Sequence, residues 1–110
     1  MKVQALLGLT LAVMAGAGVS ACGDDGEATG STCPSDSALT YDNFGQEFFA
    51  TNCLACHGSN GPESPKFETV AQTRANSGEI DRQAAAGPNA VNTSMPESGS
   101  VAEADRRKLG

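Results

Sequence analysis

The pentapeptide Cys-Leu-Ala-Cys-His at residues 53–57 constrains this chain of 110 residues more than any other feature. Its two thiols stand three positions apart, and the imidazole that follows them belongs to His57, the sole histidine of the chain. A CxxCH run is typical of the covalent attachment of a c-type haem, in which Cys53 and Cys56 bind two vinyl groups and His57 ligates the iron. The motif therefore predicts one covalently bound haem c per chain.

Two other uses of a CxxC pair fit the sequence less well. A thioredoxin-like dithiol needs a βαβ context, and a zinc site needs a second pair of ligands. The remaining cysteines are Cys22 and Cys33, which form no second CxxC pair. A haem also suits the composition, because four Phe, one Tyr and no Trp make a poor core for a small domain. We expect the chain to be largely unfolded without haem.

The first 21 residues have the pattern of a signal peptide. Lys2 gives a minimal positive start, and an uncharged apolar run follows from Val3 to Val19. The sequence Val-Ser-Ala-Cys at residues 19–22 resembles a bacterial lipobox, which predicts that Cys22 is lipidated and anchors the protein to a membrane. The alternative is an ordinary signal peptide cut near Ala21, which leaves Cys22 unmodified.

Residues 22–37 are expected to be a lipid-anchored flexible linker before a haem domain at residues 38–110. Residues 23–31 contain no large apolar side chain, so we expect them not to pack. Without the signal peptide, and therefore without Lys2, six basic residues face thirteen acidic ones, a net charge of −7. This charge argues against nucleic acid as a partner. It suits a redox partner with a basic docking patch, or simply keeps a secreted domain soluble. The expected location is the bacterial cell envelope, facing the periplasm or the exterior.

The pattern of helix signals predicts an all-α fold without convincing strands. Thr40 is placed to cap a helix that enters the CxxCH motif, and Ser100 with Glu103 has the sequence of a capping box for the last helix. On the first of these helices, an every-fourth-residue spacing places four residues on nearly one face. They are Gly45, Phe49, Cys53 and His57. The expected helices cover residues 41–54, 68–74 and 79–86, and a stretch from residue 100 onward.

These elements resemble those of class I c-type cytochromes over about residues 38–110. The shared features are an aromatic-bearing helix before CxxCH, a loop-rich middle, a Met-Pro loop and a C-terminal helix. In that family the first helix crosses the last, and Gly45, Phe49 and Leu109 match residues of the crossing. The family's next aromatic residue would fall beyond Gly110, which suggests that the sequence is truncated at its C-terminus. Cys33 would then pair with a cysteine in the missing tail, or remain a free thiol.

The resemblance implies that Met95 is the second axial ligand of the iron. Met95 is the only methionine after the signal peptide, lies 38 residues after His57 and precedes a proline. A gap-filling methionine in the core is the alternative. Pro62 resembles the family proline whose carbonyl accepts the Nδ1–H bond of His57, although a neighbouring carbonyl would also serve. Asn92 is expected either to keep the loop soluble or to bond a propionate or the Met95 sulfur.

With both axial positions filled, the expected function is electron transfer by a carrier without enzyme activity of its own. A thioether ligand stabilises ferrous iron and raises the reduction potential. One alternative is a haem subunit of a larger oxidoreductase complex. Another is a gas or redox sensor, in which Met95 dissociates and the iron binds a small molecule. A surface lipoprotein without haem is the last alternative.

Overall fold

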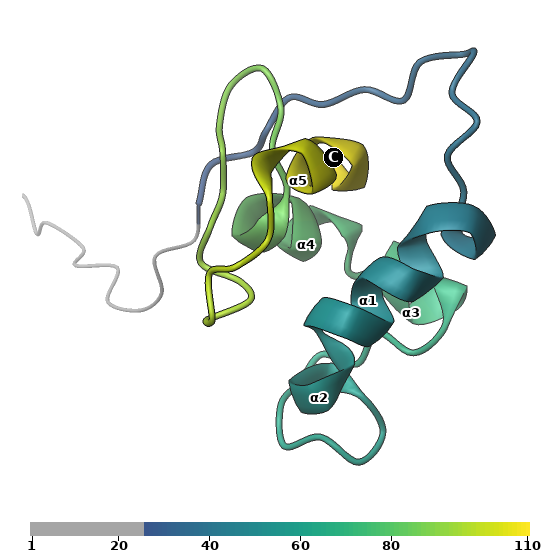
Figure 1. Cartoon of the computed structure of the whole chain (residues 1–110), viewed down its shortest axis with the longest axis vertical. Coiled ribbons are helices and arrows are strands. Elements are labelled where there is room, and N and C mark those ends of the chain that lie inside the picture. Colours follow the sequence, from purple (N-terminus) through teal and green to yellow (C-terminus); the bar gives the residue numbers. More distant parts are fainter. Residues whose placement is uncertain (1–25) are drawn as a thin grey trace, which may run out of the picture.

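The computed structural model describes residues 26–110, so the predicted signal peptide and Cys22 lie outside the described residues. The described part is helical and contains no strand, apart from one isolated antiparallel bridge between Ala86 and Val91. The all-α prediction is therefore confirmed (Figure 1). Within residues 26–110, none of the helices has both the length and the apolar character needed to cross a membrane. The elements are η1 (Tyr41–Gly45), α1 (Gln46–Asn52), α2 (Leu54–His57), α3 (Val70–Ala75), α4 (Ser77–Ala84) and α5 (Glu103–Leu109).

The helix predicted at residues 41–54 forms with nearly the expected extent but in three consecutive pieces. Thr40 caps it as predicted, and Asn43 completes a reciprocal capping box with the Thr40 backbone. The first turn is a π-turn, because the Phe44 and Gly45 amides both donate to the Thr40 carbonyl, at 3.1 and 3.2 Å. A break at Cys53, where φ is −126°, separates α1 from α2. This break places the CxxCH motif on its own short turn.

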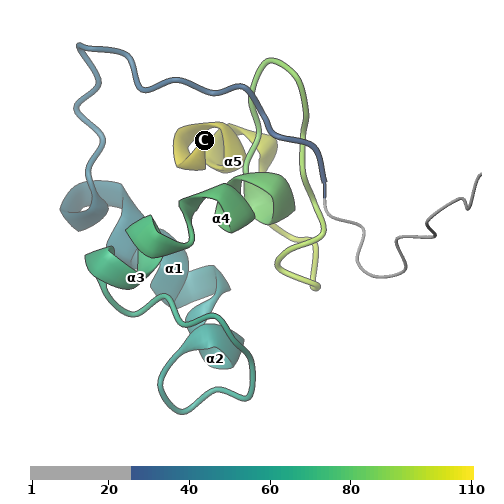
Figure 2. The same ribbon diagram turned by 180° about the vertical axis from the view of Figure 1, so that it is seen from behind.

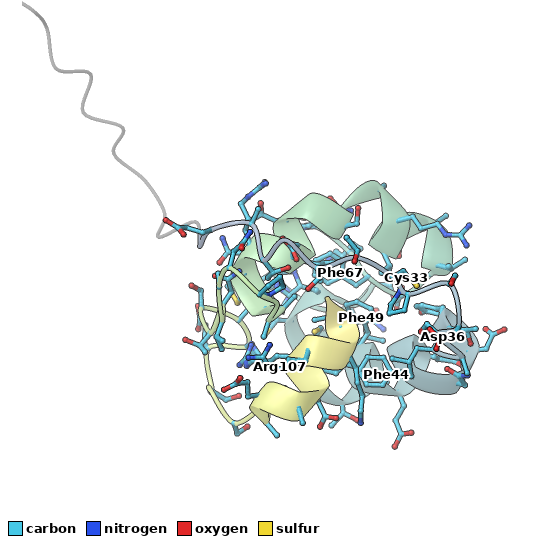
Figure 3. The ribbon with its side chains drawn as sticks, turned by 90° about the horizontal axis from the view of Figure 1, so that it is seen from above. Cys33, Asp36, Phe44, Phe49, Phe67 and Arg107 are labelled. Carbon is cyan, nitrogen blue, oxygen red and sulfur yellow. The ribbon has the colours of Figure 1, made fainter. Side chains whose placement is uncertain are left out.

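The core lies between α1, the segment before α3, and α4. Phe48, Phe49, Phe67 and Ile80 are buried and form one apolar cluster. Phe49 contacts Phe48 edge-on and Phe67 at a tilt, with both ring centroids 5.7 Å away. Phe49 and Phe67 lie side by side in the interior in Figure 3. Phe49 lies at the centre of this cluster, with an exposed fraction of only 2%.

The C-terminal helix α5 packs on the same cluster through Leu109, and the Lys108 ammonium lies 5.8 Å from the centre of the Phe44 ring. At Gly45, which the resemblance matches to the helix crossing, the three atoms nearest to an added Cβ all belong to Tyr41. A Cβ atom at Gly45 would meet the ring of Tyr41, one turn earlier in the same segment, at 3.0 Å. The glycine therefore makes room for its own neighbour.

The predicted capping box at the start of the last helix is wrong. Helix α5 begins at Glu103, and Ala102 occupies the N-cap position without a side-chain bond. Ala102 is extended, with φ −62° and ψ 143°, and its carbonyl accepts the first helical bonds from the Asp105 and Arg106 amides. Residues 100–102 therefore belong to the loop before α5, and Val101 in this loop packs against the apolar cluster.

Residues 26–31, which we call the N-terminal strap, are bound to the folded domain. Thr29 is fully buried, and its amide and hydroxyl donate to the two carboxylate oxygens of Asp81, at 2.9 and 2.5 Å. The Asn92 amide donates to the carbonyl of Glu27 at 2.7 Å. The prediction that these residues cannot pack is therefore wrong, because hydrogen bonds hold them where apolar contacts are lacking. From the strap, the chain runs along one edge of the molecule to η1 (Figures 1 and 2).

Candidate cofactor site

The three residues of the CxxCH motif lie on one turn of backbone. The Cys56 and His57 amides both donate to the Cys53 carbonyl, at 3.1 and 2.8 Å. Cys53 is half-buried and Cys56 is exposed, and both are free thiols. Burial raises the pKa of the Cys53 thiol to about 11. The turn thus places two cysteines that form no disulfide with each other beside one imidazole.

The imidazole of His57 is fixed in one orientation by a backbone carbonyl. Its Nδ1 lies 2.7 Å from the Pro65 carbonyl oxygen. A carbonyl only accepts hydrogen bonds, so Nδ1 carries the proton and Nε2 has a free lone pair. Such a contact orients an imidazole and increases its basicity toward a metal. His57 is therefore prepared to ligate through Nε2.

Pro65, and not the predicted Pro62, supplies this carbonyl. The segment after His57 folds back on the motif, because the Glu63 amide donates to the Cys56 carbonyl and the Phe67 amide donates to the His57 carbonyl. These two bonds flank Pro65 in the chain and bring its carbonyl to the Nδ1 edge of the ring, while Pro62 remains exposed. The sequence indicated that a proline carbonyl accepts the His57 hydrogen bond, but it did not indicate how many residues separate this proline from His57.

Two glycines allow the loop to fold this tightly. A Cβ atom at Gly61 would lie 2.2 Å from the Cys56 carbonyl oxygen, and one at Gly58 would lie 2.5 Å from that of Leu54. Both distances are impossible for a real side chain, so the close return of the chain requires glycine there. Phe67 then packs on the His57 ring with their centroids 4.9 Å apart.

The donor set on this turn fits a covalently bound haem. Two free thiols three positions apart are suited to thioether bonds, and a single imidazole nitrogen is left to ligate iron. Among residues 26–110 there is no group of three or more His, Cys, Asp or Glu side chains arranged to hold a metal ion. Cys53 and Leu54 pack against the apolar cluster, so a haem bound to Cys53 would adjoin apolar side chains.

Comparison with known protein families agrees with this chemistry. The model of the family described as Cytochrome c matches residues 44–109. The chain belongs to the cytochrome c family. It therefore carries a covalently attached haem c and transfers electrons to and from redox partner proteins, as carriers of this family do. No curated protein and no solved structure matches the chain.

The predicted second ligand of this cytochrome, Met95, comes from a separate part of the fold. It is half-buried in the loop between α4 and α5, which lies to one side of the helices while α2 lies to the other (Figures 1 and 2). The backbone of Met95 is held at two points. Its amide donates to the Gln83 carbonyl at 2.8 Å, and its carbonyl accepts from Arg106 at 2.7 Å. The fold thus gathers Cys53, Cys56 and His57 on one turn, and ligation by Met95 stays a prediction.

Two polar residues near Met95 have roles that the sequence did not indicate. Asn92 is only 6% exposed, and its side-chain amide donates to the carbonyls of Glu27 and Asp81. Asn92 was expected to keep the loop soluble, or to bond a propionate or the Met95 sulfur. Its side-chain nitrogen instead bonds two backbone carbonyls of the protein. Arg106, for which the sequence indicated no role, is buried behind the same loop. Cys33, by contrast, is an exposed free thiol.

Proposed function

We propose that this cytochrome is a membrane-tethered monohaem electron carrier with His57 and Met95 as its axial ligands. The observation that carries the proposal is the 2.7 Å contact between His57 Nδ1 and the Pro65 carbonyl, which leaves Nε2 free beside two free thiols. When bound, the haem iron takes up and releases one electron. The role of Pro65 is to hold the imidazole still, so that its geometry is the same in both oxidation states.

Support for Met95 comes from how firmly its backbone is held. An axial ligand on a mobile loop would detach easily, but the Met95 amide and carbonyl are both bonded, to Gln83 and Arg106. A thioether from this position would fill the sixth coordination site and raise the reduction potential. Electron transfer is then favoured over sensing of a gas, because no open position remains on the iron.

The ligand assignment is tested by visible spectroscopy of the protein matured with haem. We expect sharp reduced bands, covalent haem on a denaturing gel, and a weak sulfur-to-iron charge-transfer band in the oxidised protein. Met95→Ala should lose that band while keeping covalent haem, because Cys53 and Cys56 are untouched. An unchanged spectrum in Met95→Ala would exclude Met95 as the ligand. Ready binding of carbon monoxide by the wild-type ferrous protein would favour the sensor.

The proposed membrane tether involves Cys22, four residues before the first residue of the strap. Because Gly26 to Ser31 are bound to the domain, four chain steps separate Cys22 from Gly26, and they span about 14 Å at full extension. A lipidated Cys22 would therefore keep the haem domain close to the membrane surface, with much less reach than a linker free up to residue 37 would give. The strap supports a restrained position and not a wide swing.

Cell fractionation tests the tether. Cys22→Ser should release the cytochrome into the soluble envelope fraction, while Cys33→Ser, which changes the other cysteine outside the haem motif, should leave it with the membranes. Membrane association of Cys22→Ser would contradict the lipid anchor.

The expected redox partner presents a basic docking patch. The net charge of −7 without the signal peptide should attract such a surface, and the attraction should weaken with added salt. A subunit of a larger oxidoreductase complex would instead remain bound to its partner through purification. Rates of electron exchange with a basic partner at low and high ionic strength therefore distinguish a mobile carrier from a fixed subunit.

A further inference from the structure

Arg106 differs from the two basic residues that follow it on α5. Arg107 and Lys108 are about half exposed at their side chains, and each pairs with an acidic residue of the same helix, Glu103 and Asp105 respectively. Arg106 is only 1% exposed and is the largest fully buried side chain among the described residues. A buried guanidinium is costly, so its position calls for a physical reason.

The contacts of Arg106 are all to backbone carbonyls. Its Nη1 donates to three carbonyl oxygens at 2.7 to 2.9 Å, and its Nε donates to a fourth at 3.3 Å. The Arg106 side chain thus links the last residue of α4, two residues of the loop between α4 and α5, and a residue just before α5. The four acceptors are the carbonyls of Ala84, Asn92, Met95 and Val101.

Carbonyl groups orient the guanidinium without cancelling its charge. No ion pair of Arg106 with an acidic side chain occurs within residues 26–110, and its Nη2 is buried without a hydrogen-bond partner. Burial lowers the pKa of Arg106 from its ordinary value, but an arginine stays protonated in proteins. A full positive charge is therefore retained inside the domain, directly behind the Met95 carbonyl.

We infer that Arg106 is a positioning residue that locks the Met95 loop and whose unpaired buried charge raises the reduction potential of the haem. The inference rests on Met95 as the proposed ligand. Oxidation adds one positive charge at the iron, and a buried cation nearby makes that state less favourable. Because the guanidinium itself is buried, salt screens its charge less than that of an exposed arginine.

A matched pair of substitutions tests the charge. Arg106→Gln and Arg107→Gln remove the same charge from adjacent positions of α5, one buried and one exposed. In a potentiometric titration of the haem-loaded protein, Arg106→Gln should favour the ferric form by about tenfold, or about 59 mV for a one-electron couple. Arg107→Gln should shift the equilibrium far less. Equal shifts in the two variants, or none in Arg106→Gln, would overturn the inference.

A measurement on the wild-type protein keeps the test decisive if Arg106→Gln does not fold. In NMR spectra of the haem-loaded protein, the Arg106 guanidinium N–H signals should exchange slowly with solvent and should shift between the ferrous and ferric states. Fast exchange, or no shift on oxidation, would contradict the inference. Failure of the Met95 proposal appears separately, as a missing charge-transfer band in the wild-type protein.

Discussion

Two regions of this cytochrome are held together by different forces. Residues 40–69, the aromatic region, form around Phe49 and Phe67 and carry the CxxCH motif. Residues 26–31 and 81–106, the hydrogen-bonded region, form around Asn92 and Arg106 and carry Met95. The first region is stabilised mainly by apolar contacts, and the second by polar side chains that donate to backbone carbonyls. His57 is thus supported by the Phe67 ring and a single backbone carbonyl, that of Pro65, whereas its proposed partner Met95 is supported by a polar network.

The difference teaches how a domain with few aromatic residues completes its fold. Apolar burial is non-directional and tolerates small shifts, which suits a motif that is also fixed by two covalent bonds. Hydrogen bonds are directional, and a broken one leaves buried groups unsatisfied. The Met95 loop lacks a covalent link, so directional bonds supply the precision there.

The largest effect is expected from breaking the aromatic region. Phe49→Ala removes a ring that is 2% exposed and touches Phe48 and Phe67, which should cost about 3–5 kcal/mol of the free energy of unfolding. Denaturant unfolding of the haem-loaded protein, followed by circular dichroism, measures this loss. The control Leu39→Ala, at a residue 45% exposed, should change stability by no more than about 0.5 kcal/mol. Equal losses in the two variants would place the core elsewhere.

A smaller effect is expected from breaking the hydrogen-bonded region. Asn92→Ala removes the side-chain donor to the Glu27 and Asp81 carbonyls in a buried site, at a cost of about 1–3 kcal/mol. The strap should loosen as well, so hydrogen exchange at the Thr29 amide should accelerate. Asn60→Ala, at an exposed asparagine, is the control. Unchanged exchange at Thr29 in Asn92→Ala would show that the other hydrogen bonds of the strap, to Asp81, Asn89 and Ala86, hold it without Asn92.

The aromatic region was largely predictable from the sequence, for a physical reason. Helical spacing of aromatic residues and the Thr40 cap are local signals, and the CxxCH motif lies on one turn. The hydrogen-bonded region was not predictable, because the partners of Arg106 are backbone carbonyls, which every residue has. Nothing in the local sequence distinguishes Arg106 from Arg107, and only the fold brings four carbonyls to one of them.

The smallest effect concerns a polar contact within the aromatic region. The backbone and hydroxyl of Ser59, with a weaker contribution from Lys66, lower the pKa of the Glu68 carboxyl below its ordinary 4.5. A carboxyl with a lowered folded-state pKa stabilises the fold above its unfolded pKa, and this stabilisation is lost as the pH falls through the folded value. Glu68→Gln should therefore be slightly less stable than wild type near neutral pH, with the difference vanishing in acid.

Thermal unfolding of wild type and Glu68→Gln across the acidic range measures this difference. Because Glu68 is exposed, we expect only a small change in melting temperature. A difference of the same size at every pH would mean that the charge of Glu68 has no part in it. The Ser59–Glu68 contact would then contribute nothing to stability through the charge of the carboxylate.

The double role of Asn92 gives the molecule a mechanical property. Its side chain holds the strap through the Glu27 carbonyl, and its own carbonyl is held by the same Arg106 nitrogen that binds the Met95 carbonyl. Tension applied at the N-terminus would therefore travel through two hydrogen bonds to the guanidinium behind the Met95 loop. Pulling on the strap of this cytochrome would thus load the Met95 loop directly.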